Sequence, residues 1–138
     1  MIHHLTIATH GPACHEITAD LSRWLKGAGD GVLTLMIRHS SASLLIQENA
    51  DPEVQADLLA WLDRMAPPAD HPSMGWITHR YEGPDDMPAH LKAAMLPTTL
   101  QIPVEGGRML LGRWQGIYVV EHRQSPHQRQ VAAMFQPA

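Results

Sequence analysis

The segment Gly31-Val32-Leu33-Thr34-Leu35-Met36-Ile37 is a nearly continuous apolar run. Its short length and its β-branched residues predict a strand. Because almost no polar side chain interrupts it, the run is expected to be buried on both faces. His39 follows two residues after Ile37. The run therefore predicts a buried strand with a histidine at its end.

Apolar spacing and turn residues predict the other elements on both sides of this run. Further strands are expected over 2–7, 44–46, 98–104, 109–115, 117–121 and 131–135, with a hairpin turn at 105–108. Helices are expected over about 13–26, from Asp51 to Pro67, and from Pro88 to Pro97. This order predicts one α+β domain over residues 1–138, with about three helices and a sheet or sandwich as its main body.

The helix after Asp51 has the clearest signals. Asp is a favoured N-cap residue, and Pro52 suits the first helical turn. One face is expected to be apolar and to consist of Val54, Leu58, Trp61, Leu62 and Met65. The segment 66–85 that follows is expected to be a long loop with a short strand at 76–80, and loops of this length are often functional.

Composition excludes several classes of protein. The chain has 138 residues, a formal charge of −4 and ten scattered basic residues, so no cationic stripe is available for nucleic acid. No apolar run approaches the ~18 residues of a membrane span, and the start of the chain lacks the features of a signal peptide. The single Cys14 cannot form an intramolecular disulfide. A cytoplasmic protein without a nucleic-acid or membrane partner is expected.

Ten histidines stand out, and three of them suggest a metal site. His39 closes the buried strand, His79 lies in the long loop, and His90 lies on the predicted third helix that this loop precedes. Three imidazoles with an open fourth position would form a catalytic zinc-type site. Their spacing matches no compact motif, however, and the alternative is that each histidine makes only local hydrogen bonds or is exposed.

Carboxylates and hydroxyls offer further candidates. An acidic pair beside a histidine could hold a divalent ion or act as a general acid and base, but Asp85 and Asp86 are explained better as helix caps. The serines after His39 lack a nucleophile-elbow motif, so binding a phosphate or closing the strand suits them better than acylation. Arg129 could clamp a phosphate or be a solvated flank, and Trp114 is expected in the core.

Five motifs in order carry a resemblance to a known family. They are His39-Ser40-Ser41-Ala42-Ser43, Gln47-Glu48-Asn49 with Asp51-Pro52, the stretch from Tyr81 to Lys92, Leu111-Gly112-Arg113-Trp114-Gln115-Gly116, and Glu121-His122-Arg123. Together they resemble the YjbQ family, also called the secondary thiamine-phosphate synthase family. The likeness runs over essentially the whole chain. It implies a distorted antiparallel β-sandwich, jelly-roll-like in outline, that assembles as a homotrimer.

The resemblance also implies a polar cleft that holds a metal ion or anions, with zinc or magnesium as the divalent metal. The metal ligands would be His39, His79 and His90, and the catalytic residues would be His39, Glu48, Asp85 and His90. The substrate-binding residues would be Ser40, Ser41, Asn49, Gln115, Glu121 and Arg129. The sequence departs from the usual family pattern at Ser40, where Thr is common, at Pro97, where glycine is common, and before Arg129.

Two classes of function follow from the resemblance. As an enzyme, the chain would be a weak thiamine-phosphate synthase acting on small phosphorylated metabolites, or a metal-dependent hydrolase. As a binding protein, it would hold a metal or a metabolite without turnover. The sequence has no P-loop and no basic cluster to stabilise a leaving diphosphate, so synthase activity is expected to be weak at most.

Overall fold

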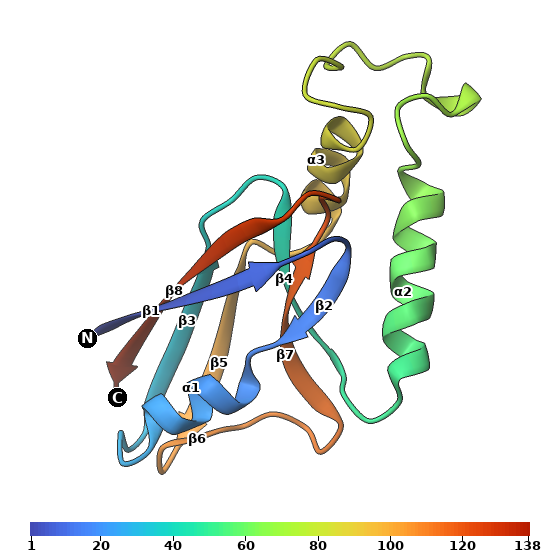
Figure 1. Ribbon diagram of the computed structural model, residues 1–138. Coiled ribbons are helices and arrows are strands. Elements are labelled where there is room, and N and C mark those ends of the chain that lie inside the picture. Colours follow the sequence, from blue (N-terminus) through green and yellow to red (C-terminus); the bar gives the residue numbers. More distant parts are fainter.

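Two antiparallel sheets form the body of the protein, and the computed structural model describes all residues from Met1 to Ala138 (Figure 1). The larger sheet has the order β1 (Ile2–Thr9), β8 (His127–Pro137), β3 (Gly31–Ile37), β5 (Thr99–Glu105) and β6 (Arg108–Met109). The smaller sheet has the order β2 (Ala13–Glu16), β7 (Gln115–Glu121) and β4 (Ala42–Glu48). Every strand pair is antiparallel.

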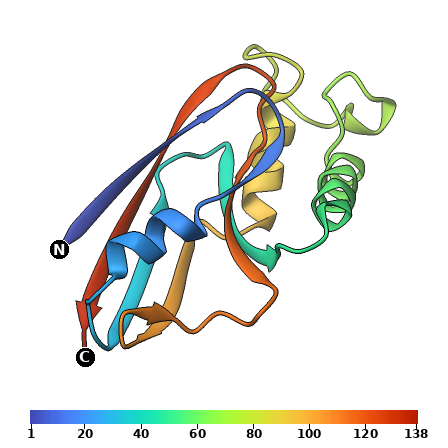
Figure 2. The same ribbon diagram turned by 60° about the horizontal axis from the view of Figure 1, so that its bottom comes forward.

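The main core lies between the inner faces of the two sheets. Leu33 and Leu35 of β3 project into it from the larger sheet, and Leu44 and Val119 enter from the smaller one. The helix α1 (Thr18–Leu25) closes one side of this core with Leu21 and other apolar residues (Figure 2). The alternation of buried and exposed residues along β8 and β3 follows from the two-residue period of a strand.

Three α-helices complete the fold, as predicted. The helix α2 (Pro52–Met65) begins after Asp51, whose carboxylate Oδ1 accepts the backbone N–H of Glu53 at 2.9 Å, so the predicted N-cap is confirmed. The helix α3 (Asp86–Met95) contacts β4, whereas α2 runs alongside the smaller sheet (Figure 1). None of the helices has the length and hydropathy that spanning a membrane requires. The predicted α+β class with antiparallel sheets is confirmed.

The segment between α2 and α3 positions one of the candidate histidines. It contains a single 3₁₀ turn, η1 (Pro72–Met74), and its own small cluster of buried apolar side chains. Arg80 holds the segment together, because its guanidinium donates to the carbonyl oxygens of Ile77, Ala69 and Met74 at 2.9–3.2 Å. His79, next to Arg80, is thereby fixed against the start of α3.

Two predicted elements are wrong. Residues 13–16 form β2 rather than the first turns of a helix, because Ala13–Glu16 pairs with β7 and only the later residues carry a helical apolar pattern. Residues 76–80 form no strand, because no neighbouring strand pairs with them, and the Ile77 carbonyl accepts a hydrogen bond from the Arg80 side chain instead. Of the strand expected over 109–115, only Met109 lies in β6 and only Gln115, as its first residue, lies in β7.

Three expectations about burial are also wrong. Val32 and Met36 of β3 are 40% and 50% exposed, because the larger sheet carries no layer on its outer face. On α2 only Leu62 of the predicted apolar face is buried, and Trp61 and Met65 are about half exposed. Trp114 is exposed instead of lying in the core, and the Arg113 guanidinium lies 4.8 Å from the centre of its ring.

Candidate metal centre

Three side chains meet where the long loop joins α3. His79 comes from the loop, Asp86 is the first residue of α3, and His90 lies one helical turn later, on the same face of the helix. Their ligand atoms all lie within 4.8 Å of one another. The Asp86 Oδ2 atom is 2.6 Å from His79 Nε2 and 3.2 Å from His90 Nε2. Two imidazole nitrogens and one carboxylate oxygen thus converge on one point.

A backbone carbonyl determines which nitrogen of His90 faces this point. Nδ1 of His90 lies 2.9 Å from the carbonyl oxygen of Ser40. Because a carbonyl oxygen only accepts hydrogen bonds, Nδ1 must carry a proton, and Nε2 of the neutral ring has a free lone pair. That lone pair points at Asp86 Oδ2, which is also an acceptor. Either a second proton on His90 or a cation is needed to make this contact favourable.

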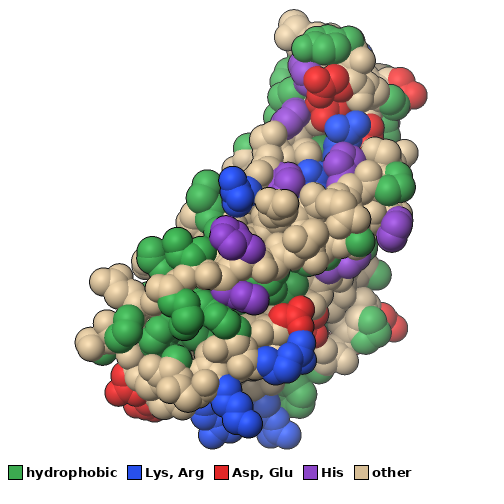
Figure 3. All heavy atoms as spheres, turned by 60° about the vertical axis from the view of Figure 1, so that its left-hand side comes forward, with side chains coloured by type: hydrophobic (Ala, Val, Ile, Leu, Met, Phe, Trp, Pro, Cys, Tyr) green, Lys and Arg blue, Asp and Glu red, His purple; other side chains and the backbone are tan.

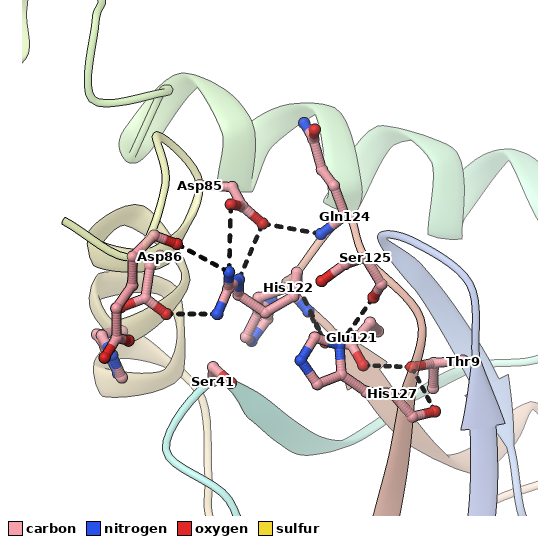
Figure 4. Close-up of polar contacts among 12 residues, drawn as sticks. Thr9, Ser41, Asp85, Asp86, Glu121, His122, Gln124, Ser125 and His127 are labelled. Carbon is pink, nitrogen blue, oxygen red and sulfur yellow. Dashed lines mark hydrogen bonds and ion pairs between the residues drawn. The ribbon is translucent and has the colours of Figure 1, made fainter. Parts of the chain in front are cut away.

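Arg123 holds the carboxylates of the two consecutive aspartates. Its Nη1 donates to Asp86 Oδ1 at 2.6 Å, and its Nε donates to Asp85 Oδ2 at 2.9 Å. Asp85 Oδ2 also accepts the backbone N–H of Gln124 (Figure 4). Burial alone would raise the pKa values of both aspartates, but hydrogen bonds, from Arg123 to Asp85 and from His79 to Asp86, hold each pKa below its ordinary value. Both aspartates are therefore carboxylates at neutral pH.

Sequence reasoning placed these aspartates differently. Asp85 occupies the N-cap position of α3 but makes no side-chain capping hydrogen bond, since Arg123 and Gln124 take its oxygens. The capping explanation favoured from the sequence is therefore wrong for Asp85. From the sequence, Asp86 is half of an acidic pair that could hold a divalent ion, but capping is preferred for it, and Arg123 is not among the candidate site residues. The signal that could have found Asp86 is its spacing of four residues from His90 on a helix.

His39 is not one of the three side chains that come together. Its Nε2 accepts the backbone N–H of Gln130 at 2.8 Å. Burial, followed by the positive charge of Arg129, lowers the pKa of His39, so the ring is neutral with its proton on Nδ1. Neither ring nitrogen then offers a free lone pair for a metal. Asp86 takes the place in the cluster that was expected for His39.

Three of the expected substrate-binding residues form a buried network of their own. Arg129 donates from Nε and Nη2 to the two carboxylate oxygens of Glu121 at 2.7 and 2.6 Å, and its Nη2 also donates to Ser41 Oγ. Thr9 donates its hydroxyl proton to Glu121 (Figure 4). Glu121 and Arg129 are 0% and 3% exposed. Because each is already bonded to the other, Arg129 is not free to clamp a phosphate. Ser40, by contrast, is exposed.

The remaining candidates lie at the far end of β4 and β7. Glu48 ends β4 and pairs with Gln115, and Asn49 follows it, so they are about 20 Å along the strand from Ser41. Each makes a local contact. Glu48 accepts the backbone N–H of Asp51, Asn49 donates to the carbonyl of Gln115, and the Gln115 side chain accepts the N–H of Gly112. Within one chain they do not join the histidine cluster.

The fold and the site define a small α+β protein with antiparallel sheets and a His/Asp cluster at the start of one helix. The family model described as "UPF0047 protein YjbQ-like" matches residues 3–138. The chain therefore belongs to the YjbQ family, as the motifs indicated.

Relatives and solved structures agree with this assignment. The chain is 43% identical to the UPF0047 protein sll1880 of Synechocystis, over 92% of this chain and 85% of that protein. It is 38% identical to the UPF0047 protein YjbQ of Escherichia coli O157:H7, over 96% and 94% of the two chains. A conserved hypothetical protein of Thermus thermophilus has a similar crystal structure, with a TM-score of 0.84, 31% identity, and coverage of 97% and 99%.

Proposed function

We propose that the protein binds a divalent metal ion between His79, Asp86 and His90. The observation that carries the proposal is the lone pair of His90 Nε2, which the Ser40 carbonyl turns towards Asp86 Oδ2. Two imidazoles and one carboxylate suit zinc better than magnesium, which prefers oxygen ligands. Three protein ligands would leave a further position open for water or for a substrate oxygen.

The residues around the cluster support this use. A histidine that binds metal commonly donates its other ring N–H to a carbonyl or carboxylate, as His90 does to Ser40. Arg123 fixes Asp86 through the oxygen that does not face the histidines. A bound metal would polarise a phosphate oxygen or lower the pKa of a bound water. We propose small phosphorylated metabolites as the ligands, with turnover of the metal-dependent hydrolase or transferase type.

Elemental analysis of protein purified without an affinity tag, followed by calorimetric titration with Zn²⁺, tests the metal site. The expected result is one Zn²⁺ per chain. Asp86→Asn and His90→Ala should each weaken binding by more than about tenfold, since loss of even an outer partner of a metal ligand costs roughly 10–100-fold. His10→Ala, at an exposed histidine without hydrogen bonds, is the matched control. Equal Zn²⁺ affinity in all variants would overturn the proposal.

We further propose that the chain supports thiamine-phosphate synthesis only weakly. That reaction expels a diphosphate, whose charge needs several positive groups in addition to one metal ion to stabilise it. The arginines around the cluster are already engaged: Arg80 with backbone carbonyls, Arg123 with Asp85 and Asp86, and Arg129 with Glu121. A dedicated diphosphate site would leave such groups available.

Complementation of cells that lack their thiamine-phosphate synthase tests this second proposal. Overexpression should support slow growth without thiamine, and His90→Ala or Asp85→Ala should abolish it. His39→Ala is the informative third variant, because it lies outside the cluster and should reduce growth only if His39 Nδ1–H contacts the substrate. Vigorous growth at low expression would contradict the proposal of weak activity.

We propose, finally, that the chain assembles as a homotrimer, as its family resemblance implies. The support is the outer face of the larger sheet, where hydrophobic side chains and histidines gather (Figure 3). The register places on the middle of this face residues without a formal charge: Ile2, His4, Thr6, Val32, Thr34, Met36, Thr99, Gln101, Pro103, Gln130, Ala132, Met134 and Gln136. Charged residues lie only towards its ends, where Glu105 pairs with Arg108 and Arg38 contacts the Gln130 side chain. A sheet face exposed to water normally carries charged residues, so this face is suited to an interface.

A further inference from the structure

Lys92 is a buried lysine that lacks a close partner. The residue is 8% exposed, although lysines are almost never buried to this extent unless they are paired. Its only ion pair is with Asp63 Oδ1 at 3.5 Å, longer than the ~2.7–2.9 Å of a charge-assisted hydrogen bond. The Asp63 side chain is 65% exposed, so the pair is weak. No protein atom hydrogen-bonds to the Lys92 ammonium group.

Lys92 and Asp63, the residue that its ammonium group faces, both line a cavity of about 270 Å³ between α2 and the end of β7. Leu59 and Leu62 of α2 form its apolar wall, and His122 lies on the opposite side. His122 is 3% exposed, its Nε2 is hydrogen-bonded to Ser43 Oγ at 2.8 Å, and its Nδ1 has no protein partner. Burial and then the charge of Lys92 lower the pKa of His122 to about 4, so its ring is neutral at pH 7.

The charges around the cavity favour an anion. Glu121 also lines it, but its carboxylate is neutralised by two hydrogen bonds from Arg129. Asp63 is the other acid, and its exposed side chain can turn away into water. Lys92 follows His90 by two residues, which is about 200° around the helix, so the cavity and the metal cluster lie on different sides of α3.

We propose that this cavity is a second binding site, which holds a small molecule bearing one carboxylate or phosphate group. The anionic oxygens replace Asp63 as the partner of the Lys92 ammonium, and the hydrocarbon part of the ligand packs on Leu59 and Leu62. The volume admits a compact metabolite rather than a nucleotide. The site is separate from the proposed metal centre and does not depend on it.

Nuclear magnetic resonance of ¹³C-lysine-labelled protein tests this site, because Lys26 and Lys92 are the only lysines. Titrations with inorganic phosphate and, separately, with butyrate should shift the Lys92 side-chain signal to saturation. The exposed Lys26 should respond only weakly. Whichever probe saturates at the lower concentration identifies the phosphate or the carboxylate as the preferred group.

Variants make the test sharper. Lys92→Met should abolish saturable binding, as followed by the backbone amide signal of His122, whereas Lys26→Met should leave it unchanged. Asp63→Asn should tighten binding by up to about fivefold, because it removes a competing carboxylate whose exposed ion pair is worth up to about 1 kcal/mol. Zn²⁺ affinity should stay the same in all three.

Two results would overturn the proposal. One is a Lys92 signal that responds no more than that of Lys26 to either probe. The other is unchanged or weaker binding in Asp63→Asn, which alters only an exposed side chain and can be measured even if Lys92→Met fails to fold. Unchanged Zn²⁺ binding in the cluster variants would overturn the metal proposal alone, because the binding of phosphate or butyrate at Lys92 does not depend on it.

Discussion

The carboxylate of Glu121 is the centre of a buried hydrogen-bond network next to the cluster of His79, Asp86 and His90. It accepts hydrogen bonds from Thr9, from two nitrogens of Arg129, and from the backbone N–H groups of His122 and Arg123. These bonds hold the pKa of Glu121 down at about 2, against the tendency of burial to raise it. The same bonds fix the backbone from which the Arg123 side chain reaches the two aspartates.

We predict that this buried pair makes folding sensitive to acid. The pKa of Glu121 falls from 4.5 to about 2 on folding, so its stabilisation is complete above about pH 4.5 and is lost as the pH falls towards 2. The shift corresponds to about 3 kcal/mol of unfolding free energy. Urea unfolding at several pH values in this window should show a clear decline.

Glu121→Gln separates this group from the other carboxylates. At pH 7 it should cost about 3–5 kcal/mol, because it leaves the Arg129 charge buried without its partner. Its stability should also change less than that of the wild type between pH 4.5 and 2. A decline in Glu121→Gln as steep as that of the wild type would show that other groups control acid unfolding.

At the scale of residues, the sequence predicted which histidines belong to the site better than it predicted the hydrogen-bond partners of each side chain. His79 and His90 were expected in one site, and they do lie together with Asp86. The ion pair between Asp85 and Arg123, which lies 38 residues later, could not be predicted, because a capping aspartate and an ion-paired one look alike in sequence. The same holds for His39, whose ring nitrogen is occupied by the distant backbone N–H of Gln130.

At the scale of elements, β3 lies at the centre of the larger sheet between β8 and β5. Its first residue, Gly31, pairs with Pro137 of β8 and Val104 of β5. A Cβ atom at Gly31 would collide with the backbone oxygen of Gln136 and lie 2.7 Å from Cζ of Phe135. The close approach of β8 to β3 at this end therefore requires glycine.

We predict that Gly31→Ala lowers the unfolding free energy by about 1–3 kcal/mol, the usual cost of overpacking. Gly75→Ala is the matched control, because its Cβ would meet nothing nearer than 4.0 Å and the φ of Gly75 is −61°. Thermal and urea unfolding of the two variants provide the measurement. Equal stability of Gly31→Ala and the wild type would mean that β8 shifts freely and that this end of the sheet is not tightly packed.

The elements that the sequence predicted well are those with local signals. Asp51 and Pro52 mark the start of α2 whatever lies around it. The failures depend on distant partners. Residues 13–16 become a strand only because β7, which begins about 100 residues later, is available for pairing, and Val32 is exposed only because no layer covers the sheet.

At the scale of the whole molecule, the candidate residues separate into two groups at opposite ends of β4 and β7. Ser41, Asp85 and His90 lie near the end with the His79/Asp86/His90 cluster, and Glu48 and Gln115 lie at the other end. The resemblance that brought them into one predicted site does not say which of them share a cleft. Assembly of several chains is one way in which the two ends could approach each other.

We predict a trimer whose mass is three times the 15.3 kDa of the chain, held together by the uncharged middle of the outer face of the larger sheet. Met134→Lys places a charge in the middle of that face and should yield monomers in light scattering. Met65→Lys makes the same change at an exposed position on α2 and should leave the trimer intact. A monomeric or dimeric wild type, or a trimeric Met134→Lys, would contradict the prediction.

Anomalous X-ray diffraction at the zinc edge, from crystals grown with Zn²⁺, tests the central proposal most directly. We predict one strong peak per chain at about 2.0–2.2 Å from Nε2 of His79, Nε2 of His90 and Oδ2 of Asp86, with the Ser40 carbonyl still bonded to His90 Nδ1. No peak should lie at His39. A cluster without a peak while zinc occupies other histidines, or a peak that includes His39 as a ligand, would contradict the proposed metal centre.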